Sequence, residues 1–61
     1  MERIYKKHST EDLLKALSNC AYGDLEEDFI LTKEILEEFI QRGKTPSQVF
    51  IMLEIFEKHS N

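Results

Sequence analysis

The fold of this chain is decided by the stretch TPSQVFIMLEIF, residues 45–56. Thr45 and Gln48 can cap each other's backbone amides, and Pro46 stands at the first helical position, where a missing N–H costs nothing. Seven of the eight residues that follow Gln48 are apolar. A helix that is apolar on every side must be buried on every side. This stretch therefore predicts a helix over residues 46–58 that needs extensive cover.

Two segments upstream also begin with helix-start signals. Ser9 precedes two acids, and its side chain is suited to accept a backbone amide of a first helical turn. Asp24 follows a glycine and precedes a second acidic first turn. Gly43 stands where the preceding helix needs a left-handed closing residue. The sequence thus predicts an all-α fold, an antiparallel helical hairpin plus a third apolar helix, with helices at about residues 10–21, 25–42 and 46–58.

The apolar spacing of the first two helices agrees with this division. The stripe of the first helix contains Leu13, Leu14, Leu17, Cys20 and Ala21. The stripe of the second contains Leu25, Phe29, Leu36, Phe39 and Ile40, with Thr32 as a polar member and with Leu31 and Ile35 widening it. We expect residues 1–8 to form a flexible N-terminal arm, either frayed or partly docked, and residues 9–61 to form a single helical domain.

The third helix has more apolar surface than two short helices can cover. Leaving half of it in water would expose a larger apolar patch than soluble monomers usually carry. One interpretation is a homo-oligomer or a target complex, and the alternative is a covered core helix with a few tolerated surface residues. The residues expected at a self-association surface are Val49, Phe50, Met52, Leu53 and Phe56.

The charge distribution argues against nucleic acid as a partner. The chain has 12 acids, 8 bases and a net charge of −4. Residues 24–41 contain seven acids and only Lys33 as a base, a net charge of −6 that would repel a phosphate backbone. This acidic run is either a solvated helix face or a surface that steers a partner. The longest apolar run, Val49–Leu53, is too short for a membrane span, and the cations near the N-terminus precede no signal-peptide core.

The residues that carry enzymatic or metal chemistry are sparse. Cys20 is the only cysteine, which excludes an intrachain disulfide and fits a reducing, cytoplasmic setting. It lies on the inward stripe, so we interpret it as a buried structural thiol, and we expect His8 and His59 at the surface. These three are too widely spaced for structural zinc. The sequence predicts no enzyme, no metal and no cofactor.

Two motifs in residues 9–42 resemble a known family. They are the start Ser9-Thr10-Glu11-Asp12-Leu13-Leu14 and the run Leu25-Glu26-Glu27-Asp28-Phe29-Ile30, after which the helix closes near Arg42. Together they resemble the Sda family of sporulation checkpoint inhibitors, helical hairpins without a third helix that bind sensor histidine kinases. The resemblance implies that Leu25 and Phe29, supported by Asp28, contact the kinase. The alternative is that Leu25 and Phe29 are ordinary core residues.

A second resemblance covers residues 34–58. An amphipathic helix, the turn Gly43-Lys44-Thr45-Pro46 and an apolar helix are similar to the dimerisation hairpin of Sin-type antirepressors and repressors. Both resemblances imply a bacterial or phage source.

The sequence therefore leaves three functional hypotheses. The first is an inhibitor of a histidine kinase or another regulatory protein. The second is a dimerising antirepressor-like module that titrates a transcription regulator. The third is a purely structural homo-oligomer or assembly protein.

Overall fold

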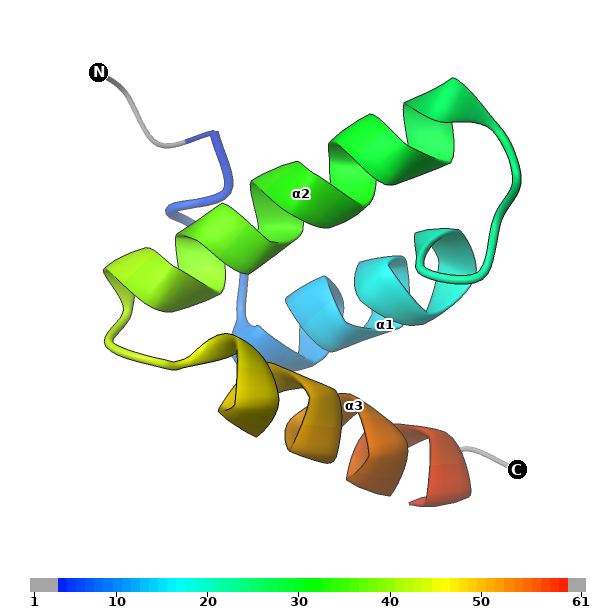
Figure 1. The fold of residues 1–61 in the computed structure, drawn as a ribbon. Coiled ribbons are helices and arrows are strands. Elements are labelled where there is room, and N and C mark those ends of the chain that lie inside the picture. The colour runs from blue at the N-terminus through cyan, green and yellow to red at the C-terminus, as the bar shows by residue number, and fades with distance from the viewer. Residues whose placement is uncertain (1–3, 60–61) are drawn as a thin grey trace.

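A computed structural model describes residues 4–59, which form three helices and no strand (Figure 1). The helices are α1 (Thr10–Cys20), α2 (Glu26–Gln41) and α3 (Pro46–His59). Each helix packs against the other two. Helices α2 and α3 diverge from the short connection that joins them, and α1 lies between them. The predicted all-α class and the three helices are confirmed.

Local capping explains where α1 and α3 begin. The Ser9 hydroxyl accepts the backbone N–H of Asp12 at 3.1 Å. At α3 the predicted capping box is present: the Gln48 N–H donates to the Thr45 hydroxyl at 3.2 Å, and the Thr45 N–H donates to the Gln48 side chain at 2.9 Å. Each bond satisfies a backbone donor that the first turn leaves without a helical partner.

The start of α2 differs from the predicted cap. Leu25 is the N-cap residue, and no side chain caps this end. Asp24 therefore lies one residue outside the position that an N-cap oxygen must occupy to reach the first-turn amides. The first turn instead carries Glu26, Glu27 and Asp28, whose negative charges favour the positive end of the helix dipole.

The end of α2 is closed by Gly43 in the predicted left-handed conformation, with φ +87°. The Gly43 N–H donates to the Ile40 carbonyl at 3.0 Å, and the Lys44 N–H donates to the Phe39 carbonyl at 3.0 Å. This pair of bonds is the Schellman motif. It reverses the chain so that α3 can start at Pro46.

Gly43→Ala is expected to lower the free energy of unfolding by about 1–2 kcal/mol, because a Cβ disfavours the left-handed conformation. Nothing lies within 4 Å of the added Cβ, so the cost comes from the backbone alone. Urea unfolding followed by circular dichroism measures it. Gly43→Asn is the control and should cost less, since asparagine tolerates this region better. An alanine variant as stable as the parent would contradict the prediction.

The core is formed by one row of side chains from each helix. Its buried members are Leu13, Leu14, Leu17, Cys20, Ile35, Phe39, Val49 and Leu53. The α1 stripe is buried as predicted, except that Ala21 is only partly buried. The Thr32 hydroxyl donates to the Asp28 carbonyl at 2.7 Å and lies 3.2 Å from the sulfur of Cys20. The Cys20 thiol is therefore a packed part of the α1–α2 contact.

An ion pair near the end of α2 ties the N-terminal segment to the helices. The Glu38 side chain is only 3% exposed and accepts a hydrogen bond from Arg42 Nε at 2.7 Å. The other end of the guanidinium donates to the carbonyls of Tyr5, at 3.1 Å, and His8. Tyr5 also packs against the core, and its burial, followed by the charge of Glu34, raises the pKa of its phenol.

Residues 4–8 of the expected flexible arm are therefore docked on the helical body. They form a turn closed by the His8 N–H on the Tyr5 carbonyl at 3.0 Å. The rest of the expected arm, residues 1–3, lies outside the described residues.

Candidate partner-binding surface

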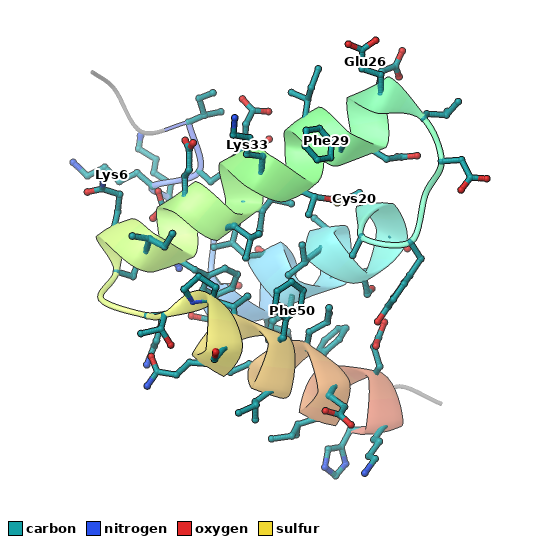
Figure 2. All side chains as sticks on the ribbon, in the orientation of Figure 1. Lys6, Cys20, Glu26, Phe29, Lys33 and Phe50 are labelled. Carbon is teal, nitrogen blue, oxygen red and sulfur yellow. The ribbon has the colours of Figure 1, made fainter. Side chains whose placement is uncertain are left out.

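The first turn of α2 presents two large apolar side chains to solvent. Leu25 is 65% exposed and Phe29, one helical turn later, is 69% exposed. Figure 2 shows the Phe29 ring on the open side of α2. Neither residue belongs to the core. The alternative in which both are ordinary core residues is therefore wrong for this fold. We call Leu25 and Phe29 the α2 knob.

Asp28 is placed differently from its two neighbours. Its side chain is partly buried and lies against the connection between α1 and α2. A Cβ added to Gly23 would overlap the Asp28 carboxylate. Because Gly23 has no side chain, the Asp28 carboxylate can lie close to its backbone. This contact sets the direction in which α2 leaves the turn. This position fits Asp28 to support the knob rather than to form its surface.

The predicted stripe of α2 is rotated in the structure. The buried apolar residues are Ile35 and Phe39, whereas Leu25, Phe29 and Ile40 are exposed. On a helix, Phe29 and Ile40 share one row with Leu36, and the row of Ile35 and Phe39 lies beside it. Both rows are apolar at the same spacing. Helices α1 and α3 pack on the row of Ile35 and Phe39, so the row of Phe29, Leu36 and Ile40 lies along the edge of the core.

Acidic side chains border the α2 knob on one side. Asp24 and Glu26 are exposed next to Leu25 in the sequence. Glu27 is exposed as well, but it lies two residues from each knob residue and therefore faces the other side of the helix. An apolar anchor inside a charged rim is the usual composition of a binding surface, because the centre supplies affinity and the rim supplies orientation. The structure therefore brings together the two apolar residues that the sequence proposed and gives them a negative border.

The residues proposed for self-association on α3 are divided by the structure. Val49 and Leu53 are fully buried against α1 and α2, so they are unavailable to a partner of the folded chain. Met52 and Phe56 pack partly against the core, and Phe50 is 50% exposed. The proposed set needs correction, because the intramolecular core takes two of its five members.

Several other exposed side chains were not singled out by sequence reasoning, among them Ile51, Ile55 and Tyr22. Ile51 and Ile55 lie on the outer side of α3, and the unbroken apolar run was the available signal for them. Tyr22 is exposed in the connection after α1, where its hydroxyl donates to the Glu57 carboxylate at 3.1 Å. This hydrogen bond, together with the charge of Glu57, raises the pKa of Tyr22.

The residues considered for chemistry do not form a catalytic or metal site in the described part of the chain. Cys20 is buried, while His8 and His59 are exposed. Residues 4–59 contain no group of three or more side chains that could hold a metal ion. An open depression between α1 and α3 is lined by Glu11, Lys15, Ser18, Asn19, Phe56 and His59.

Within the described residues, the candidate binding surface is thus formed by exposed apolar side chains on α2 and α3 rather than by a pocket. None of the helices within residues 4–59 has the length and apolar character needed to cross a membrane.

No protein-family model, curated protein or solved structure matches the chain.

Proposed function

We propose that this chain is a small cytoplasmic regulatory protein that binds and inhibits another protein through the α2 knob, without catalysis of its own. The observation that carries the proposal is the exposure of Leu25 and Phe29, at 65% and 69%. A folded chain that holds two large apolar side chains in water gains free energy when a partner covers them. The histidine-kinase-inhibitor type is favoured by the resemblance of residues 9–42 to the Sda family.

The acidic border of the knob supports the same class of function. Charges on a rim accelerate association with a partner of opposite sign and reject partners of like sign. The target surface should therefore combine an apolar groove for Phe29 with lysine or arginine side chains opposite Asp24 and Glu26. A groove between two helices, such as those of a kinase dimerisation domain, would suit an aromatic anchor.

Phe29→Ala is expected to weaken target binding by about 2 kcal/mol or more, roughly thirtyfold, while leaving the melting temperature nearly unchanged. Leu25→Ala should act in the same direction. The binding loss reflects a removed anchor, and the melting curve is spared because both side chains are outside the core. Affinity purification with wild-type and Phe29→Ala baits identifies the target, and calorimetry on the purified pair measures the difference.

Phe50→Ala is the matched control, because Phe50 is also an exposed phenylalanine but lies on α3. Binding lost in Phe29→Ala and kept in Phe50→Ala supports the α2 knob. The opposite pattern would contradict it. That result would favour the antirepressor-like alternative, in which the exposed apolar residues Phe50, Ile51 and Ile55 of α3 form the contact.

A further inference from the structure

The apolar row that begins at Phe29 of the knob continues along the outside of α2. Phe29, Lys33, Leu36 and Ile40 follow one another at spacings of four, three and four residues. This is the spacing of the inward positions of a coiled coil, with one lysine among three apolar residues. Phe29 and Ile40 are exposed, and Leu36 is partly buried. The row is therefore a helix face that the fold leaves without a complete partner.

The charges around this row have opposite signs at its two ends. Glu26 precedes it and Lys44 follows it, and Lys33 and Glu37 lie near its centre. All four side chains are exposed. Figure 2 shows Glu26 near the beginning of α2 and Lys33 farther along the same helix. The face is acidic where α2 begins and basic just after it ends.

A second copy of the same face, turned antiparallel, is complementary to the first. It places Phe29 opposite Ile40 of the other copy, and the two charge pairs become Glu26 with Lys44 and Lys33 with Glu37. Within α2 the midpoints of the Phe29–Ile40 and Lys33–Glu37 pairs in the sequence are 34.5 and 35. Because these two midpoints nearly coincide, one two-fold axis across the middle of α2 satisfies both pairs. The same axis brings the beginning of each helix, with Glu26, to the end of the other, just beyond which Lys44 lies. A parallel arrangement would instead place Glu26 against Glu26 and Lys33 against Lys33.

We infer that the partner of this α2 face is a second copy of the chain, in an antiparallel homodimer that pairs Glu26 with Lys44 across the interface. A lone lysine at an inward position sets the register and orientation of helix pairs at some cost in stability, so the dimer is a reversible one. The α3 residues Ile51 and Ile55 stay outside this interface.

The dimer has one consequence for regulation, which rests on the proposed function. Phe29 belongs both to this face and to the α2 knob, so it cannot contact a target and a second copy at the same time. Dilution, or capture by a target, would then release the monomer as the inhibitory form.

Variants in which the charges of Glu26 and Lys44 are swapped test the dimer on the protein alone, without any target. Sedimentation equilibrium measures the dimer dissociation constant of each variant. Glu26→Lys and Lys44→Glu should each raise the dimer dissociation constant roughly tenfold, since each turns two symmetry-related attractions into repulsions of surface strength. The double variant Glu26→Lys/Lys44→Glu restores opposite charges and should return to within about threefold of the parent. Phe29→Ala, which removes an apolar contact from both copies, should weaken the dimer more than either single charge change.

Glu27→Lys is the matched control, because Glu27 is exposed one residue farther along but points away from the row. Its charge change at the start of α2 has the same unfavourable effect on the helix dipole as Glu26→Lys. Restoration in the double variant cannot come from relief of that effect, since the double variant keeps the Glu26→Lys change. Circular dichroism of each variant verifies folding.

Three outcomes would overturn the inference. The first is a parent protein that remains monomeric at all concentrations tested. The second is a dimer that is insensitive to both single charge changes. The third is a dimer that Ile51→Ser weakens and Phe29→Ala does not, which would place the interface on α3. Failure of the dimer leaves target binding by the monomer intact, so the two proposals are distinguishable.

Discussion

Arg42→Met is expected to lower the free energy of unfolding at the lower end of the roughly 3–5 kcal/mol typical of a broken buried ion pair. The change leaves the Glu38 carboxylate, 3% exposed, without the guanidinium 2.7 Å away. It also removes the hydrogen bonds to the carbonyls of Tyr5 and His8. The Arg42 side chain is itself 21% exposed, so solvent screening keeps the effect below the upper end.

The size of this effect is large for so short a chain. At about 0.05–0.15 kcal/mol per residue, a domain of this length has a total stability of roughly 3–9 kcal/mol. The Arg42→Met protein should therefore lose at least about a third of its stability. Chemical unfolding measures the loss, and amide hydrogen exchange should show faster exchange at His8, whose N–H closes the docked turn.

Two variants separate the ion pair from a general effect of removing a cation. Lys15→Met removes an exposed positive charge on α1 and should change stability by no more than about 0.5 kcal/mol. Glu38→Met/Arg42→Met replaces both charges with apolar groups and should recover much of the loss, since no charge is then left buried. An Arg42→Met protein as stable as the Lys15→Met control would show that the pair does not stabilise the fold.

Phe39→Ala is expected to cost about 3–5 kcal/mol, the range for a buried aromatic truncated to alanine. Phe39 is 1% exposed and packs in the core with side chains from all three helices. The cavity removes packing on α1 and α3 as well as on α2. Loss of most of the helical signal in dilute buffer, with recovery at low temperature or in a stabilising osmolyte, is the expected measurement.

Phe29→Ala makes the same chemical change ten residues earlier on the same helix. Because Phe29 is 69% exposed, its truncation should alter stability by no more than about 0.5 kcal/mol when unfolding is measured at a concentration at which the chain is monomeric. Helix propensity rises equally in both variants, so their difference isolates burial. Similar losses in the two proteins would contradict the assignment of Phe39 to the core and Phe29 to the surface.

The helices could be predicted from sequence because their signals are local. A capping side chain or a left-handed glycine acts on backbone groups within about four residues. Ser9, Thr45 with Gln48, and Gly43 each take the predicted role. Asp24 does not take the predicted N-cap role. The local sequence Asp24-Leu25-Glu26 does not fix the first helical residue to better than one position. The proposed apolar anchors Leu25 and Phe29 came from a short motif, and no local signal indicated their exposure.

Only the tertiary structure decided which faces of α2 and α3 are buried, whereas the single apolar stripe of α1 was already evident in the sequence. Helix α2 has two neighbouring apolar rows with the same period, and periodicity cannot choose between Phe29 with Ile40 and Ile35 with Phe39. The choice depends on where α1 and α3 pack, which is a property of segments far apart in the chain. The same packing buries Glu38 inside an otherwise acidic, solvated run. It also allows Arg42 to reach carbonyls more than thirty residues earlier.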